Sequence, residues 1–366
     1  MKKKTYNAID IFSGAGGLSL GAQWAGIDIS YAIEINKSAA ASYQSNHSDV
    51  KVLTEDIGKI DATQFVSQDN PVSIIMGGPP CQGFSLSNTK TRNMDNQKNY
   101  LFREFVRFVR DVKPDWFLFE NVGGLTNLDH GEVEKMIEDC FREIEGKNGV
   151  KYTVKSKVLW AHEYGVPQKR NRFFMVGNCK GIDFEFPAPS CVSDCFVTVE
   201  DAISDLPLLD NGDNVEEANY SKPIDKISDY AKRMRRGSLR STQNYVSRNN
   251  DLVIKRYHHI PQGGNWRDIP NSLMENYKDK SRCHSGIYKR LRANEPSVVI
   301  SNYRKSMLVH PYQDRGISVR EAARLQSFPD TFKFEGPISH IQQQIGNAVP
   351  PLLAKAVFEQ IMKYAQ

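Results

Sequence analysis

The stretch VSIIMGGPPCQGFS, from Val72 to Ser85, is an apolar run that ends in a stiff turn. The run from Val72 to Met76 predicts a short buried strand, and the Gly-Gly-Pro-Pro segment behind it stops that strand. Cys81 follows directly, so we expect its thiol at the carboxyl end of a strand, where open α/β sheets bind ligands. A free cysteine is most often a small buried hydrophobic residue. A rigid turn in front of it instead favours a nucleophile.

Short apolar runs alternate with helical patterns through the first half of the chain. Strands are predicted at 8–12, 29–35, 72–76, 116–120 and 172–177, and helices at 101–112 and 132–144. This alternation predicts an α/β fold with a doubly wound, mostly parallel sheet. From about residue 187 to 315, Pro, Gly and Asn break the pattern, which indicates a smaller, irregular domain. We therefore expect a catalytic domain at 1–187 and 343–366, a second domain at 188–315 and a connecting hinge at 316–342.

The composition is that of a soluble globular protein, with 40% hydrophobic and 25% charged residues in a chain of 366. No apolar run approaches the roughly 20 residues of a membrane span. The basic N-terminus lacks the apolar core of a signal peptide, so we expect a cytoplasmic protein. The six cysteines are scattered without metal-site spacing, and no metal is expected. Cys191 and Cys195 are the nearest pair and are interpreted as loop cysteines.

Positive charge is concentrated in one segment. Residues 221–320 carry 21 Lys and Arg against 8 Asp and Glu, a balance of +13 in a chain whose net charge is +5. The run from Lys232 to Arg236 does not mix signs as a solvated surface usually does. Nucleic acid is the natural partner of such a segment, in which several aromatic residues are interleaved.

A glycine-rich loop follows the first predicted strand and opens a helix. The loop from Asp10 to Leu18 would let backbone amides approach a ligand at the helix N-terminus. Because position 19 is Ser, the third glycine of a dinucleotide fingerprint is missing. Glu34 ends the next strand, where a carboxylate can accept hydrogen bonds from two ribose hydroxyls, and Asp56 ends the strand after it. A tight structural turn is the alternative interpretation of the loop.

Two further strand ends carry polar side chains. Glu120 ends the strand at 116–120, at the same predicted sheet edge as Cys81. A thiol beside a partly buried acid suits attack on an electron-poor ring. Arg170 and Arg172 precede another strand on one face and could hold a carbonyl oxygen and a phosphate. A strand-end cap and surface salt bridges are the alternatives.

Together these motifs resemble the DNA cytosine-5 methyltransferase family of the bacterial and phage restriction–modification type. The strings DIFSGAGGLSLG, GGPPCQGFS, ENV, QKRNR, VREAARLQSFPD and QIGNAVPP stand in that family's order and cover about two thirds of the chain. The resemblance implies the S-adenosylmethionine-dependent methyltransferase fold and methyl transfer to C5 of a flipped-out cytosine, with S-adenosylhomocysteine as product. Since the first predicted strand begins at once, we expect no N-terminal regulatory domain.

The resemblance also implies roles for individual residues. Cys81 is the expected nucleophile toward C6, Glu120 protonates N3, Arg172 holds the base oxygen and Arg170 positions neighbouring backbone. The expected cofactor-lining residues are Phe12, Gly14, Gly16, Gly17, Leu18, Glu34, Ile35, Asp56, Ile57, Pro80, Leu101, Asn347 and Val349. Position 35 is Ile where several relatives have an aromatic ring, which implies weaker stacking on the adenine.

Duplex DNA is the expected partner. A cognate restriction endonuclease is a possible functional partner. We expect a monomer without membrane contact. The expected DNA-binding residues are Ser85, Ser87, Arg233, Arg235, Arg236 and Arg240. Segments 258–267 and 288–306 are candidate base readers or, equally, folding elements. A tRNA cytosine-5 methyltransferase and a non-catalytic DNA-binding relative are the alternative functions, and the larger basic domain favours DNA over tRNA.

Overall fold

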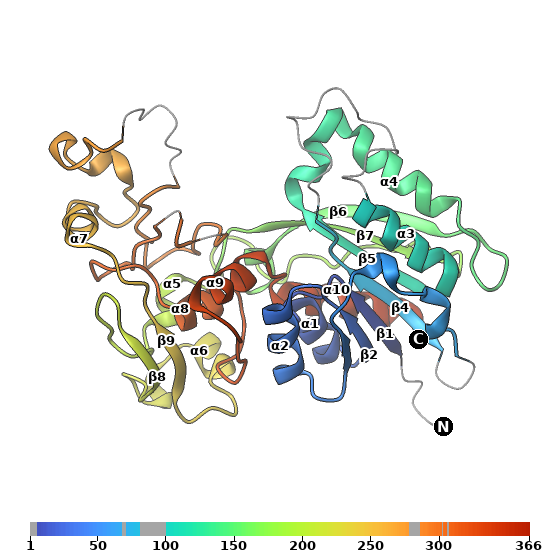
Figure 1. Ribbon diagram of the computed structural model, residues 1–366, viewed down its shortest axis with the longest axis horizontal. Coiled ribbons are helices and arrows are strands. Elements are labelled where there is room, and N and C mark those ends of the chain that lie inside the picture. Colours follow the sequence, from blue (N-terminus) through green and yellow to red (C-terminus); the bar gives the residue numbers. More distant parts are fainter. Residues whose placement is uncertain (1–5, 68–70, 81–99, 278–285, 302, 306) are drawn as a thin grey trace. The chain divides into compact units, whose positions relative to one another are not determined.

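The computed structural model describes residues 6–67, 71–80, 100–277, 286–301, 303–305 and 307–366 (Figure 1). The chain forms two compact units. Unit 1 consists of residues 1–160, 171–189 and 351–366, and unit 2 of residues 161–170 and 190–350. The predicted division differs from these units at 161–170, at 188–189, at the predicted hinge 316–342 and at 343–350, which was predicted with the catalytic domain but lies in unit 2. Residues 161–170 belong to unit 2, and so does the whole predicted hinge at 316–342, because its helix is part of the unit 2 core.

Unit 1 is built on a seven-stranded sheet in the order β3-β2-β1-β4-β5-β7-β6. The strands are β1 (Asn7–Ile11), β2 (Asp28–Ile33), β3 (Lys51–Leu53), β4 (Val72–Gly77), β5 (Trp116–Val122), β6 (Thr153–Trp160) and β7 (Asn171–Asn178). The first five pair in parallel, whereas β7 is antiparallel to both β5 and β6. This confirms the predicted mostly parallel α/β sheet. β6 was not predicted, because its side chains follow no clean alternation between buried and exposed.

Helices cover both faces of this sheet (Figure 1). They are α1 (Gly17–Trp24), α2 (Lys37–Asn46), α3 (Tyr100–Val112), α4 (Glu132–Arg142) and α10 (Pro351–Ala365), with short 3₁₀ turns η1 (Ile57–Lys59), η2 (Ala62–Phe65) and η5 (Gly123–Gly131). On one face, aromatic residues of α3 and α4 form a core with Phe117, Phe119, Ile9 and Ile11. Because strand side chains alternate, Asp10 and Glu120 lie on the other face.

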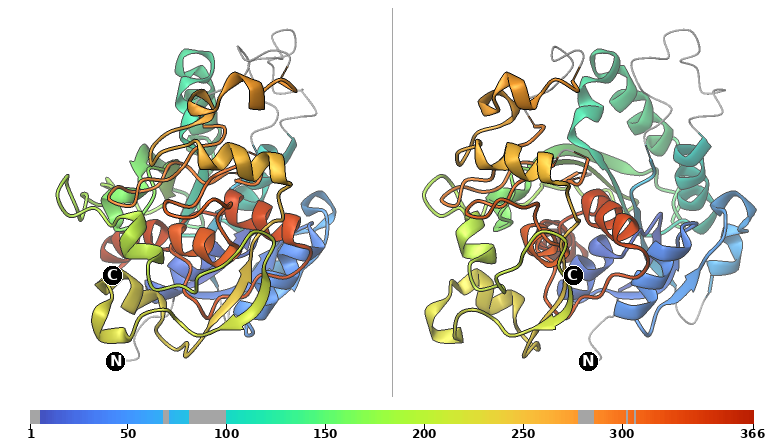
Figure 2. Two further views of the ribbon diagram at one scale, coloured as in Figure 1. Left: turned by 90° about the vertical axis from the view of Figure 1, so that its left-hand side faces the viewer. Right: turned by 60° about the vertical axis from the view of Figure 1, so that its left-hand side comes forward.

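Unit 2 has little regular structure. Its elements are η6 (Ala161–Tyr164), α5 (Val199–Ile203), β8 (Asn214–Ala218), η7 (Ile224–Lys226), α6 (Asp229–Met234), β9 (Ser241–Tyr245), α7 (Asp251–His258), η8 (Trp266–Asp268), η9 (Asn271–Leu273), α8 (Val319–Leu325) and α9 (Ile338–Asn347). The strands β8 and β9 form an antiparallel pair. Helix α8 lies beside α5, α9 and β9 in the middle of the unit (Figures 1 and 2).

Buried arginines organise unit 2. Arg324 on α8 is fully buried; its Nε lies 2.6 Å from Asp330 Oδ1 and its Nη1 lies 3.0 Å from Asp205 Oδ1. Arg315 lies 2.7 Å from the buried carboxylate of Glu321. Arg256, Arg290, Arg315 and Arg320 are also buried, and all four fall in the basic segment 221–320. Part of the basic excess in that segment is therefore internal and serves the fold.

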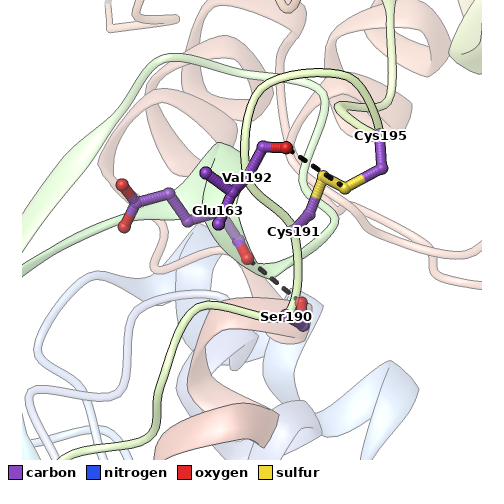
Figure 3. Close-up of a disulfide and its surroundings, with 5 residues drawn as sticks. All are labelled: Glu163, Ser190, Cys191, Val192 and Cys195. Atoms are coloured by element: carbon purple, nitrogen blue, oxygen red, sulfur yellow. Dashed lines mark hydrogen bonds between the residues drawn. A yellow bond between two sulfur atoms is a disulfide. The ribbon is translucent and has the colours of Figure 1, made fainter.

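A disulfide joins Cys191 and Cys195 in the loop that precedes α5 (Figure 3). Both residues lie in a loop, as interpreted from the sequence, but the bond was not predicted from a spacing of four residues. The backbone N–H groups of Ser190 and Cys191 and the Ser190 hydroxyl all donate to the Glu163 carbonyl (the Ser190 contacts at 3.0 Å) and anchor the loop.

Within the described residues, no helix is both long and apolar enough to cross a bilayer. The same residues contain no cluster of three or more His, Cys, Asp or Glu side chains arranged for a metal ion.

Candidate active site

Glu120 and Arg172 form a buried ion pair in unit 1. β5 and β7 are antiparallel neighbours, and their register places Arg172 opposite Val122, two residues beyond Glu120. Arg172 Nε lies 2.7 Å from Glu120 Oε1, and both side chains are buried. Burial raises the pKa of Glu120, and the Arg172 charge partly offsets this shift. The pair therefore combines an acid that can hold a proton with a fixed cation.

The turn that ends β4 is fastened to this pair. A Cβ at Gly78 would lie 2.4 Å from Glu120 Oε2, so only glycine allows the carboxylate to approach the backbone so closely. Asn121 Nδ2 donates to the Pro79 carbonyl at 2.9 Å. The chain therefore reaches position 81 from a turn anchored to β5. Cys81, Ser85 and Ser87 lie outside the described residues.

The glycine-rich loop binds the carboxylate that ends the second strand. The Gly14 N–H donates to Glu34 Oε2 at 2.8 Å, and the Asn36 N–H donates to Glu34 Oε1 at 2.7 Å. Burial raises the pKa of Glu34, while these N–H groups lower it. A carboxylate has about four acceptor positions, so lone pairs remain for ligand hydroxyls.

The shape of the loop fits a ligand that approaches the backbone closely. Gly14 has φ +55°, and a Cβ there would meet no atom within 4 Å, so the backbone borders open space. At Gly16, with φ +97°, a Cβ would lie 2.5 Å from His47 Nε2, so glycine is required. Gly17 then begins α1, whose first N–H groups have no partner within the helix. These features fit the ribose and the amino-acid group of S-adenosylmethionine.

The remaining cofactor candidates occupy varied environments. Ile35 is 67% exposed directly after Glu34, whereas Ile57 is buried in the core under α3. Asp56 caps η1 by accepting from the Gly58 N–H at 3.0 Å. Phe12 and Leu101 pack at the edge of the same core. Asn347, at the end of α9, and Val349 belong to unit 2.

Arg170 is a structural residue of unit 2. Its Nη1 donates to the Ile300 carbonyl at 2.8 Å and its Nη2 to the Gly346 carbonyl at 2.7 Å. The guanidinium is buried. It fixes two backbone segments, which agrees with positioning of backbone but gives no support to a direct catalytic contact.

The basic residues around α6 differ from one another. Arg235 is packed: it donates to the Lys222 carbonyl at 3.0 Å, lies 3.5 Å from Asp205 and sits 3.7 Å above the Tyr220 ring. Arg233 and Arg236 are exposed, and Arg240 lies 3.4 Å from Glu217. Only Arg233 and Arg236 therefore present free-standing surface charge of the kind predicted for the cluster.

The two candidate base-reading segments also differ. Tyr288 is fully buried, and Arg290 donates to the backbone carbonyls of Ile260, His310 and Gln313. These residues of 288–306 are folding elements. In the other segment, His259 and Arg267 are exposed, and Arg267 lies 5.5 Å above the Trp266 ring.

Asp10 and Asn121 were not predicted as residues of the site. Asn121 follows Glu120, so its side chain points to the opposite face of the strand, where it binds the turn. The signal for Asn121 in the sequence was its position directly after Glu120. Asp10 precedes the loop in a strand and is fully buried with Ser19 Oγ at 2.5 Å from Oδ2. The signal for Asp10 in the sequence was a charged residue inside an apolar run.

Comparison with known proteins identifies the family of the chain. Residues 6–363 match the family model described as C-5 cytosine-specific DNA methylase. The Type II methyltransferase M1.HphI of Haemophilus parahaemolyticus is 36% identical over 97% of this chain and 86% of its own length. The Type II methyltransferase M.DdeI of Desulfomicrobium norvegicum is 34% identical over 98% of this chain and 89% of its own.

A solved structure supports the same assignment. An E. coli prophage protein solved as a candidate DNA modification methyltransferase superposes with a TM-score of 0.77 at 27% identity, covering 98% of this chain and 99% of its own. The match extends through both units rather than the sheet alone. The chain therefore belongs to the C-5 cytosine-specific DNA methylase family.

Proposed function

We propose that this protein transfers the methyl group of S-adenosylmethionine to C5 of one cytosine within a specific duplex DNA sequence. The observation that carries the proposal is the buried Glu120–Arg172 pair, 2.7 Å apart and fastened to the turn that leads to Cys81. Such a pair suits a ring with a basic nitrogen beside a carbonyl oxygen. Cytosine offers N3 and O2 in that arrangement.

The chain's own residues would hold the methyl donor. Glu34 would accept the ribose hydroxyls, and the amides of the loop at Gly14 to Gly17 would approach the amino-acid group. Asp56 and the exposed Ile35 would border the adenine. When bound, S-adenosylmethionine supplies an electrophilic methyl group on a positively charged sulfur.

Glu120 and Arg172 would bind and activate the base. Because burial raises the pKa of Glu120, this carboxyl can be protonated and donate to N3. Arg172 would donate to O2 and keep the ring oriented. Both contacts draw electrons from C6 and make it open to attack.

Cys81 would be the nucleophile. Its thiolate would add to C6 and place negative charge on C5, which would take the methyl group from the sulfonium of a bound donor and leave the neutral thioether. Loss of the C5 proton to a base restores the ring double bond and expels the thiolate. A cytosine in duplex DNA hides C5 and C6 in the base stack, so the base must be flipped out at a cost of a few kcal/mol.

We infer a biological role from the relatives. Both curated relatives carry the name of Type II methyltransferases, so protection of host DNA against a cognate restriction endonuclease is the role that this similarity supports. The same names favour duplex DNA over tRNA as the substrate. They also favour an active enzyme over a non-catalytic DNA-binding protein.

Substitution of Cys81 tests the mechanism. Cys81→Ser should abolish incorporation of labelled methyl groups into DNA, while DNA binding, measured by fluorescence anisotropy, stays within a few-fold of wild type. A matched control is Cys140→Ser, since Cys140 is a half-buried free thiol on α4. It should keep full activity. Turnover by the Cys81 variant would exclude the covalent mechanism, and bisulfite sequencing of DNA from expressing cells would identify the target cytosine.

A further inference from the structure

Asp10 occupies a central place in the unit 1 sheet. It lies near the carboxyl end of β1, between β2 and β4. Glu34 directly follows β2, and Glu120 lies on β5, the strand beyond β4. Asp10 and Glu120 are on the same face of the sheet. A ligand that reaches from the ribose site at Glu34 to the base site at Glu120 must therefore pass the end of β1.

The Asp10 carboxyl is only half satisfied. Its Oδ2 accepts from Ser19 Oγ at 2.5 Å, and Ser19 Oγ also lies 2.6 Å from the Tyr43 hydroxyl. Its Oδ1 is buried and has no hydrogen-bond partner among the described residues. A buried polar oxygen without a partner is costly and marks a place that a water, a ligand or a proton can complete.

In the described part of unit 1, the charged groups that act on Asp10 are all acidic. Burial raises the pKa of Asp10 to about 8, the Ser19 hydrogen bond lowers it, and Glu34 and Glu120 raise it further. The packed helices contribute the hydroxyls of Ser19 and Tyr43, and the Tyr43 pKa is itself raised well above its usual range. Arg172 is already paired with Glu120. A positive charge is missing from this cluster.

We propose that Asp10 is the residue that senses the positive charge of the methyl donor: it becomes ionised when a cationic sulfonium occupies the loop and is protonated when the neutral thioether product is there. This inference rests on the proposed function. Asp10 acts through space from beneath the loop, as a specificity-determining residue. The ionised carboxyl favours the donor, and protonation lets the product, which lacks the charge, leave without an uncompensated anion.

The proton balance is simple. Binding of the donor moves one proton from Asp10 to solvent, and conversion of the donor to the product allows one proton to return. Around pH 7 the free protein holds that proton in most molecules, because the pKa of Asp10 is about 8. No oxidant, reductant or further reactant is involved.

Calorimetric titration tests the inference without catalysis. S-adenosylmethionine and S-adenosylhomocysteine are each titrated into the full-length protein at pH 7.2 in buffers of different ionisation enthalpy, which gives the number of protons released. We expect release to be greater for the cationic ligand by up to one proton. The two ligands share their ribose, adenine and amino-acid groups, so the difference isolates the sulfonium. Equal proton release by the two ligands, measured with the wild-type protein, would by itself overturn the inference.

Two variants assign the proton to Asp10. Asp10→Asn should abolish the difference between the ligands and bring their affinities closer together. Glu120→Gln is the matched control at the other carboxyl; it removes a charge that raises the pKa of Asp10, so the difference should become smaller but remain measurable. A difference that persists in Asp10→Asn would refute the proposal, and its disappearance in Glu120→Gln would then assign the proton to Glu120. Failure of both ligands to bind wild-type protein would contradict the proposed function instead, so the two failures are distinguishable.

Discussion

Carboxyl groups are buried in both units, and the shifts of their pKa values are opposite. In unit 1, burial raises the pKa values of Asp10, Glu34 and Glu120. In unit 2, Arg315 holds the pKa of Glu321 at about 2 despite burial, and Arg324 lowers that of Asp330. Burial acts on the carboxyl groups of both units, so the neighbours of each carboxyl decide the direction of its pKa shift.

The hydrogen bonds that each carboxylate accepts from arginine explain this difference. Arg324 faces two carboxylates at once, and Glu321 accepts two hydrogen bonds from Arg315. Asp10 has only hydroxyl partners, and Glu120 has a single arginine. Unit 2 uses charge to hold an irregular chain together. Unit 1 leaves its charges incompletely matched, which is typical of a site that binds ligands.

The largest effect that we expect from this contrast is in unit 1. Glu120→Gln keeps the shape and removes the acid, so methyl transfer should fall by about 10²–10⁴-fold, the usual contribution of a general acid. The free energy of unfolding should also fall, because the buried Arg172 guanidinium loses its anion and cannot give up its own charge. Single-turnover methyl transfer and urea unfolding measure the two quantities. Activity within tenfold of wild type would show that Glu120 does not protonate the base.

The converse substitution is in unit 2. Arg324→Met leaves Asp205 and Asp330 buried without their shared cation, and we expect a loss of about 3–5 kcal/mol in the free energy of unfolding. Arg172→Met is the matched control in unit 1. Its loss should be smaller, since Glu120 has a raised pKa and can take up a proton. Equal losses in urea unfolding would contradict the distinction between the units.

The sequence predicted unit 1 much better than unit 2. The strand predicted at 72–76 is observed as Val72–Gly77, and that at 116–120 as Trp116–Val122. These strands are buried on both faces and so appear as continuous apolar runs. Glu120 and Arg172 followed from motifs at strand ends. Their pairing did not, because it depends on the antiparallel register of β5 and β7, which local pattern does not encode.

Unit 2 escaped prediction for a physical reason. Its core contains buried guanidinium groups, and buried ion pairs produce no hydrophobic periodicity in the sequence. Arg235 and Arg236 are adjacent and identical in type, yet one is packed on Tyr220 and the other is exposed. A count of charges therefore overstated the basic surface of segment 221–320, all of which lies in unit 2.

Acid should weaken unit 2 through His310. Burial lowers the pKa of His310 from 6.5 to about 4, and its Nε2 lies 3.6 Å from Glu321. The unfolded chain binds the proton first, so stability is complete above pH 6.5 and falls as the pH drops toward 4, by at most about 1.4 kcal/mol per pH unit. His310→Gln should reduce the measured slope of unfolding free energy between pH 7 and 4, and the buried His47 of unit 1, whose pKa is also lowered to about 4, should keep its own contribution. An unchanged slope would mean that His310 is protonated in the folded protein.

The smallest expected effect separates the two adjacent arginines. Arg236→Gln should reduce the slope of log affinity against log salt for DNA binding by about one unit if Arg236 contacts one phosphate, with no loss of stability. Arg235→Gln should leave that slope unchanged and cost about 1–3 kcal/mol, because the Lys222 carbonyl and Asp205 lose a buried donor. Fluorescence anisotropy at several salt concentrations and urea unfolding measure both variants. An unchanged slope for Arg236→Gln would mean that this surface of α6 does not contact DNA. A reduced slope for Arg235→Gln would mean that Arg235 leaves its packed position to bind a phosphate. The buried charges of unit 2 would then not serve the fold alone.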